Sequence, residues 1–290
     1  MSDDGSTGLV VIGMLGNVFS PAYAAARRRD PRAEPLDFCT MNVALYGARG
    51  DAFALTERRR EAVFRTKDEL VIGRSVMRWE GGALRVDLDE RRAPFGGRIR
   101  GRVRIEPGPV LCHHAVLDGH GRHHWWPVAP TARAEVTLDE PNLRFSGNAY
   151  HDVNAGDEGL EDGFSSWSWS RGNTKSGAVV AYDVTRRDGE RASLGVTVDR
   201  HGQVSPLSAP AWSPLPATAW RLERRTRSDH GQDARLLRTL EDTPFYARSL
   251  VETELLGERV RAVHEVVSLD RFASSWVRFL IPFRMHHRDR

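Results

Sequence analysis

Cysteine is nearly absent from this sequence of 290 residues, which holds only Cys39 and Cys112. Two cysteines cannot build a disulfide framework, and no CxxC pair indicates zinc binding or thiol redox work. Lysine is as scarce, since Lys67 and Lys175 are the only lysines among 42 basic residues. So strong an arginine bias is more typical of a GC-rich genome than of a basic nucleic-acid-binding face. We therefore expect no nucleic-acid partner, although the net charge is +3 and the pI is near 9.1.

Long hydrophobic runs are also missing. The longest, "GLVVIGMLGNVF" at residues 8–19, is too short to span a bilayer. The N-terminus carries Asp3 and Asp4 where a secretory signal would carry positive charge. These features predict a protein without signal peptide or transmembrane helix that stays on the cytoplasmic side.

Helical periodicity is scarce, and alternation of apolar and polar residues dominates instead. "SVMRWEGGALRVDLD" alternates on both sides of Gly81 and Gly82, which is a hairpin signal. "RIRGRVRI", residues 98–105, has the period of a strand with one solvated face. We predict an all-β chain of antiparallel barrels, with a boundary near "DEPN" that separates domains 1–140 and 141–290. Eight-stranded barrels can hold one small ligand.

Two segments are exceptions that predict short helices. "SPAYAAARRR", residues 20–29, begins with a Ser-Pro start signal and an alanine run. Near the C-terminus, Phe272, Trp276 and Phe279 recur at helical spacing between arginines. Such a helix either docks on its own domain, which we favour, or lies on anionic lipid in a peripheral membrane contact.

The residues that could carry chemistry fall in three short stretches, of which "HHWWP" at 123–127 is the most unusual. In a strand, side chains two residues apart point to the same face. Three pairs are related in this way: Tyr150 with Asp152, His123 with Trp125, and Trp167 with Trp169. Together they could line one cavity.

This set of side chains suits the protonation of an unactivated carbon–carbon double bond. The acid must hold its proton, and burial achieves this because it raises the pKa of a carboxyl group. A positioned histidine can orient the acid, and aromatic faces stabilise the resulting carbocation by about 0.5 to 2 kcal/mol each. The cation can then take up water, lose a proton or cyclise.

Less specific interpretations compete with this one. Trp167 and Trp169 alternate with serines and are more often core than functional. "NAGDEGLED" is typical of a solvated loop, and the histidine run lacks the spacing of a zinc site, so we predict no metal. There is no GxSxG, GxGxxG or Walker motif.

Several longer motifs point to a known family. They include "NVALYG", "SGxxYxDxNxGDExLEDxFxSWxWSR", "YDVTRRDG" and "RTLEDTPFYARS". Together with "HxWxPxAPxARxEV" they cover nearly the whole chain, which resembles the acyclic carotenoid 1,2-hydratases, also called hydroxyneurosporene synthases.

The resemblance implies a lipocalin-like fold with two β-barrel domains and a few short helices. It also implies cofactor-free addition of water to the terminal C1–C2 double bond of an acyclic carotenoid such as neurosporene or lycopene, in a protein that serves photosynthetic bacterial membranes. In the family's motifs the proton donor falls on Asp152, and the other catalytic positions fall on Tyr150, His123 and Trp125.

Our hypothesis is a hydro-lyase in which Asp152 protonates C2 and His123 orients the acid and later accepts a proton from water. Trp125 and Tyr150 shape the pocket, and Trp167 and Trp169 bind substrate. Two alternatives remain: a terpenoid cyclase that uses the same protonation, and a lipocalin-like carotenoid carrier without catalysis.

Overall fold

The computed structural model describes residues 1–47, 50–94, 96–208 and 210–287 of the chain. It divides into two compact units. The first comprises Met1–Pro107, Ala132–Ala149 and Arg278–Arg290, and the second comprises Gly108–Thr131 and Tyr150–Val277. The units interleave along the sequence, so the boundary at residue 140 that the sequence suggested does not coincide with their borders.

The first unit contains a four-stranded sheet of order β1-β2-β3-β21. Its strands are β1 (Gly8–Met14), β2 (Cys39–Tyr46), β3 (Ala52–Arg58) and β21 (His286–His287). Strand β21 runs parallel to β3, and the other pairs are antiparallel. Three short helices accompany the strands of this unit: α1 (Pro21–Arg29), η1 (Pro35–Phe38) and η2 (Arg60–Ala62).

A second, eight-stranded sheet has the order β11-β10-β8-β7-β6-β5-β4, with β9 paired to β10. Its strands are β4 (Val63–Arg65), β5 (Glu69–Ile72), β6 (Ser75–Glu80), β7 (Ala83–Arg91), β8 (Arg98–Pro107), β9 (Ala115–Val116), β10 (His123–Glu140) and β11 (Leu143–Gly156). The long strands β10 and β11 contribute residues to both units.

Local sequence explains these strands. In β8, Ile99 and Val103 are buried whereas Arg100 and Arg102 point to solvent, as the alternation predicts. The turn between β6 and β7 has positive φ at both Gly81 and Gly82, a backbone that glycine adopts without strain and that matches the twist of a two-residue hairpin.

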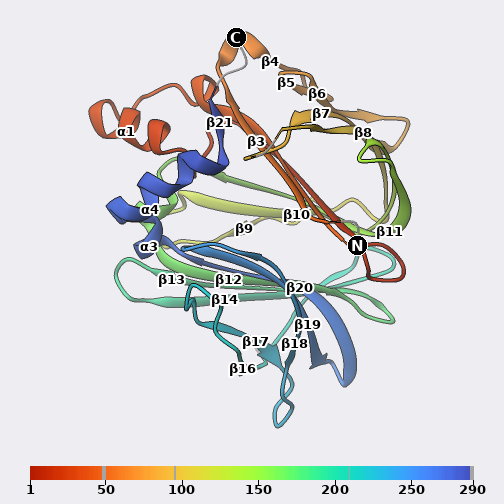
Figure 1. Ribbon diagram of the computed structural model, residues 1–290. Coiled ribbons are helices and arrows are strands. Elements are labelled where there is room, and N and C mark those ends of the chain that lie inside the picture. The colour runs from red at the N-terminus through yellow and green to blue at the C-terminus, as the bar shows by residue number, and fades with distance from the viewer. Residues whose placement is uncertain (48–49, 95, 209, 288–290) are drawn as a thin grey trace. The chain divides into compact units, whose positions relative to one another are not determined.

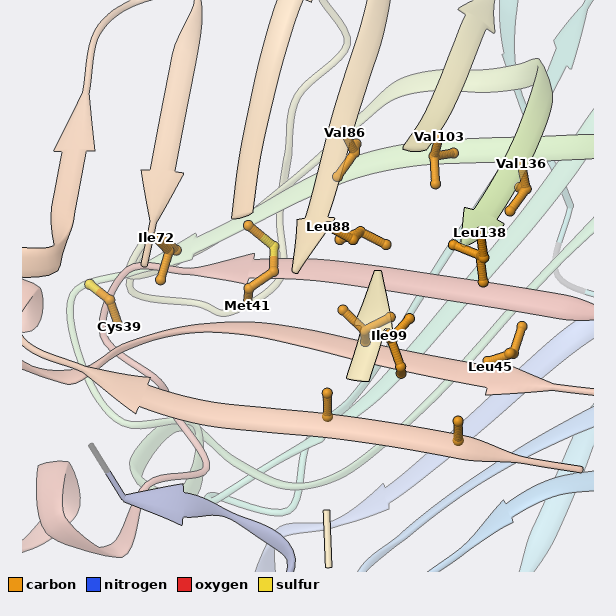
Figure 2. Packing of buried hydrophobic residues seen from close by; sticks show 13 residues of the cluster. Cys39, Met41, Leu45, Ile72, Val86, Leu88, Ile99, Val103, Val136 and Leu138 are labelled. Atoms are coloured by element: carbon orange, nitrogen blue, oxygen red, sulfur yellow. The ribbon is translucent and has the colours of Figure 1, made fainter. Parts of the chain in front are cut away.

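The core of the first unit lies between its strands (Figure 2). Figure 2 shows Met41 of β2 together with Leu88, Ile99 and Leu138 of the eight-stranded sheet. All four side chains are nearly inaccessible to solvent. Burial of each such side chain contributes roughly 1.5–3 kcal/mol.

The second unit is built on a seven-stranded antiparallel sheet of order β15-β14-β13-β12-β20-β19-β18, whose central strands lie side by side in Figure 1. Its strands are β12 (Phe164–Asn173), β13 (Gly177–Arg186), β14 (Arg191–Asp199), β15 (Val204–Pro206), β18 (Arg235–Asp242), β19 (Tyr246–Leu255) and β20 (Glu258–Ser268). A separate ladder joins β16 (Ala211–Leu215) and β17 (Arg224–Ser228).

Both predicted helical segments are confirmed. Helix α1 begins after Ser20, whose Oγ accepts a hydrogen bond from the Tyr23 N–H at 3.2 Å. Near the C-terminus the chain forms α3 (Leu269–Ala273), α4 (Ser275–Leu280) and η3 (Ile281–Arg284), and the short helix α2 (Leu160–Gly163) precedes β12. Within the described ranges, no helix combines the length and apolar character needed to cross a bilayer.

The predicted fold class is confirmed, since strands dominate and the helices are few and short. One detail is corrected. In the described part of the chain no sheet closes on itself by hydrogen bonds between its first and last strands. The expected barrels are therefore open sheets.

Candidate active site

One face of the seven-stranded sheet carries the candidate residues Trp167 and Trp169, and its rings also contact Trp125 and Tyr150. Along β12, Trp167, Trp169 and Arg171 alternate with serines and a glycine, so they share a face. Pairing between strands then sets their neighbours. Trp169 lies opposite Tyr182 on β13 and opposite Glu265 on β20.

Asp152 on β11 is the centre of this group. Its Oδ2 accepts a hydrogen bond from the Trp125 indole Nε1–H at 3.0 Å and a second from the Tyr150 hydroxyl at 3.0 Å. The sequence predicted that Asp152 and Tyr150 share a face of one strand, and the structure brings them together with Trp125 of β10.

The surroundings of Asp152 favour its neutral form. Burial raises its pKa from 3.8 to about 6, and the negative charge of Glu265 also raises it, whereas the hydrogen bonds from Trp125 and Tyr150 lower it. The carboxyl group therefore retains its proton at a far higher pH than an exposed aspartate does.

The donors of these hydrogen bonds are held by other rings. Trp125 is completely buried. Its ring contacts the Tyr182 ring edge-on, and the two ring centroids are 5.8 Å apart. The centroids of the Tyr150 and Trp169 rings are 5.3 Å apart. Burial raises the pKa of both Tyr150 and Tyr182, so both phenols keep their protons at neutral pH.

Arg171 adds a cation to this face. Its guanidinium lies 5.8 Å from the centre of the Tyr150 ring and donates hydrogen bonds to the Pro130 carbonyl and the Asn173 side chain. No carboxylate of the described residues forms an ion pair with it. Burial without a counter-charge lowers the pKa of Arg171 to about 10.

We predicted that His123 orients the acid, but the structure places its side chain away from the Asp152 carboxyl group. Its buried ring packs on Phe164 with centroids 4.7 Å apart, and its Nε2 lies 3.4 Å from Glu158 Oε1. The side-chain hydrogen bonds that position Asp152 come from Trp125 and Tyr150 instead. His123 reaches this group indirectly, through Phe164, whose ring meets the edge of Trp167.

Trp167 and Trp169 are both only partly buried. Trp167 contacts the edge of Tyr182, with centroids 6.3 Å apart. The Trp169 Nε1–H is buried and finds no hydrogen-bond acceptor among the residues that the structure describes. A buried N–H group without an acceptor costs free energy in the folded state. The indole N–H is therefore suited to donate a hydrogen bond to a bound water molecule or ligand.

The remaining members of "HHWWP" lie elsewhere. His124 and Trp126 stack with His114, with ring centroids 4.8 to 5.6 Å apart, and the His124 Nδ1 lies 2.7 Å from the His114 Nε2. This matches the expectation that adjacent residues of this stretch point to opposite faces.

Three residues of the site were missed by sequence reasoning. Arg171 follows Trp167 and Trp169 at the same spacing of two, so the alternation could have identified it. Tyr182 and Glu265 join the site through strand pairing alone, and no local pattern marks them.

Comparison with known proteins gives a consistent result. A family model described as carotenoid hydratase CrtC matches residues 11–290. An acyclic carotenoid 1,2-hydratase of Thiocapsa roseopersicina is 50% identical over 286 residues, which are 98% of this chain and 70% of that protein. The enzyme of the same name from Rubrivivax gelatinosus is 45% identical over 99% of this chain and 71% of its own length. The one from Cereibacter sphaeroides is 37% identical over 96% of this chain and 98% of its own length.

Among solved structures, a putative AttH from Nitrosomonas europaea superimposes with a TM-score of 0.56. The match covers 80% of this chain and 82% of that one at 12% identity. At this identity the likeness shows a shared lipocalin-like fold and nothing about chemistry.

Proposed function

This chain belongs to the CrtC carotenoid hydratase family, and we propose that its hydration of acyclic carotenoids is driven by Asp152 acting as a neutral acid. The reaction adds water across the terminal C1–C2 double bond of a substrate such as neurosporene or lycopene. Water is the only reagent that this addition consumes, and the proton that the acid donates is regained when the attacking water loses one, so the proposed reaction needs no cofactor.

The observation that carries this proposal is the environment of Asp152. Both donors, Trp125 and Tyr150, bond to the same oxygen, Oδ2. A neutral carboxyl group has one carbonyl oxygen that accepts and one hydroxyl oxygen that donates. With Oδ2 as the acceptor, the acid proton belongs on Oδ1, from which it is transferred to C2.

Protonation at C2 leaves a tertiary cation at C1. As the proton departs, Oδ2 keeps its two donors, and these stabilise the carboxylate that forms in the transition state. The partly exposed rings of Trp167, Trp169 and Tyr150 offer their faces to the cation and to the polyene. We assign substrate binding to the two tryptophans on this basis.

For His123 we propose a positioning role. Its ring packs against Phe164, which in turn contacts Trp167. Fixing the His123 ring thereby fixes one side of the aromatic group in which the cation forms.

The test is incubation of lycopene in detergent with the purified protein, followed by chromatography and mass analysis. We expect a product heavier by one water. Asp152→Asn should lower turnover by at least about 10³-fold, because general acid catalysis is lost. Asp157→Asn, an exposed aspartate just beyond β11, is the matched control and should retain turnover.

The same experiment separates the alternatives. A terpenoid cyclase would give a product of unchanged mass, and a carrier would return unchanged lycopene after long incubation as a pigmented complex. Undiminished hydration by Asp152→Asn would show that another group is the acid.

Because the substrate is a membrane pigment, we also propose peripheral contact of the α4–η3 segment with the cytoplasmic face of the membrane. Trp276, Phe279 and Phe283 of this segment are 48%, 69% and 64% exposed and recur at helical spacing. Their exposed rings are suited to insert at the interface between headgroups and acyl chains.

Co-sedimentation with vesicles that contain anionic phospholipid tests this contact. Replacement of Phe279 and Phe283 by Ala should release the protein from the vesicles. Phe64→Ala, which removes a phenylalanine of β4 that is 56% exposed, should not. Equal binding by all three proteins would exclude the contact.

A further inference from the structure

Hydration requires a second proton transfer that the role of Asp152 leaves open. When water attacks the C1 cation, the oxygen becomes a protonated oxonium, which must lose a proton to give the alcohol. The following inference rests on the proposed function and concerns the group that accepts this proton.

Glu265 is a second carboxylate near Asp152, on the face of the seven-stranded sheet that carries Trp169. It lies on β20 directly opposite Trp169, and its negative charge is close enough to raise the pKa of both Asp152 and Tyr182. Its side chain is 23% exposed, so it is neither sealed in the core nor free in solvent.

An arginine holds this carboxylate from one side. The Arg248 Nε donates to Glu265 Oε1 at 2.7 Å, and Arg248 itself is buried. Within the described residues, Oε2 of Glu265 accepts no hydrogen bond. One oxygen of the carboxylate is thus fixed by an ion pair, and the other remains available as an acceptor.

Trp169 supplies a complementary donor. Its buried Nε1–H has no acceptor in the described part of the chain. Trp169 and Glu265 are cross-strand neighbours, whose Cβ atoms lie about 4.5–5.5 Å apart. A water molecule bound by an indole N–H and a carboxylate oxygen uses one lone pair and one hydrogen. Its second lone pair stays free to attack a cation.

We propose that Glu265 and Trp169 hold the attacking water and that Glu265 is the base of the hydration. Asp152 and Glu265 then divide the work: the neutral carboxyl group donates a proton, and the ion-paired carboxylate accepts one. Pairs of carboxyl groups in contrasting environments are a common solution for acid and base chemistry in one site.

The proton balance closes over one cycle. The O–H bond of Asp152 breaks and a C2–H bond forms, and water oxygen bonds to C1. The oxonium then loses its proton to Glu265 Oε2, which yields the neutral tertiary alcohol. Glu265 is left protonated and Asp152 ionised, and exchange with solvent returns each to its starting state.

Deuterium labelling distinguishes this role from a structural one. The proteins are incubated with lycopene in detergent prepared in D2O, and both the product and the recovered lycopene are analysed by mass. If Glu265 is the base, Glu265→Gln still protonates the alkene but captures water poorly. The cation then returns to alkene by losing a proton, and recovered lycopene gains deuterium.

We expect Glu265→Gln to lower hydration by about 10²-fold or more while deuterium uptake into lycopene persists. Asp152→Asn should show neither hydration nor uptake. The matched control is Glu252→Gln, another arginine-paired glutamate on the same sheet, which should hydrate as the wild type does.

Two results would overturn the inference. One is hydration by Glu265→Gln at close to the wild-type rate, and the other is loss of hydration without deuterium uptake in a variant whose unfolding curve matches the wild type. If Glu265→Gln fails to fold, Trp169→Phe provides the same comparison, because it removes the indole donor and leaves both carboxylates. Failure of the wild type to hydrate lycopene would instead refute the proposed function.

Discussion

The indole nitrogen of Trp125 lies 3.0 Å from Oδ2 of Asp152, the oxygen that also accepts the Tyr150 hydroxyl. Two donors on one oxygen distinguish the two oxygens of a carboxyl group that would otherwise be equivalent. They mark Oδ2 as the carbonyl oxygen and leave Oδ1 to carry the proton. The geometry thus defines which atom of Asp152 acts on the substrate.

Removal of the Trp125 donor should weaken the acid. Because this hydrogen bond lowers the pKa of Asp152, Trp125→Phe should raise that pKa and move the fall in kcat/KM to higher pH. Turnover should fall about 10- to 100-fold, since a hydrogen bond to a developing carboxylate contributes roughly 1.5–3 kcal/mol.

The control for this variant is Trp167→Phe. Trp167 contacts Tyr182 and Phe164 rather than Asp152, so its replacement should leave the pH of the fall unchanged even if substrate binds less well. An equal shift in both variants would contradict the assignment of the Trp125 bond.

The pH dependence of the wild type follows from the need for a protonated acid. Because burial raises the pKa of Asp152 to about 6, kcat/KM should be constant below this value. Above it, kcat/KM should fall about tenfold for each unit of pH, as the neutral form becomes rare. Steady-state rates across this range provide the check, and a profile that rises through pH 6 would be incompatible with Asp152 as the acid.

The same carboxyl group should make the folded protein less stable at neutral pH. The folded-state pKa of Asp152 lies above the ordinary 3.8, so the folded protein binds more protons between 3.8 and about 6 and loses stability as pH rises through this window. Asn at this position does not titrate. At pH 7, Asp152→Asn should therefore increase the free energy of unfolding by up to about 3 kcal/mol relative to wild type.

Urea denaturation at two pH values tests this prediction. The gain should vanish below about pH 4, where Asp152 is protonated in both the folded and the unfolded chain. Asp157→Asn, at an exposed position, should change stability at neither pH. If Asp152→Asn were less stable than wild type at pH 7, burial of the ionised Asp152 carboxylate would not destabilise the folded protein as predicted.

The position of the His123 ring depends on two glycines. A Cβ atom at Gly163 would lie 2.7 Å from His123 Nε2, and one at Gly156 would lie 2.7 Å from Nδ1. Gly163→Ala should displace the ring, destabilise the protein by about 1–3 kcal/mol and reduce turnover. In Gly119→Ala the new Cβ would meet nothing closer than 3.6 Å, so this control should behave as wild type.

The sequence predicted those parts of the site in which the residues lie two apart on one strand. Alternation placed Tyr150 with Asp152, and Trp167 with Trp169, because a strand's side chains repeat every two residues. It could not place Tyr182 or Glu265, since these depend on which strands pair and in which register. Tyr182 also lies in β13, which is buried on both faces over most of its length and so shows no alternation.

The same limit explains two differences in the fold. The two units alternate along the sequence, and the sheets formed by the described residues stay open; both features depend on long-range pairing. For His123, sharing a face with Trp125 was correct, but the two glycines and Phe164 that hold its ring come from other segments.

The most direct test of the central claim is the titration of Asp152 itself, observed as the carbonyl stretch of a protonated carboxyl group in the infrared spectrum of wild type minus that of Asp152→Asn. We predict that the band is present below pH 6 and disappears with a midpoint of about 6, together with the fall in kcat/KM. Disappearance of the band near the ordinary value of 3.8 would contradict the account, because Asp152 would then be ionised under the conditions in which it is proposed to donate its proton.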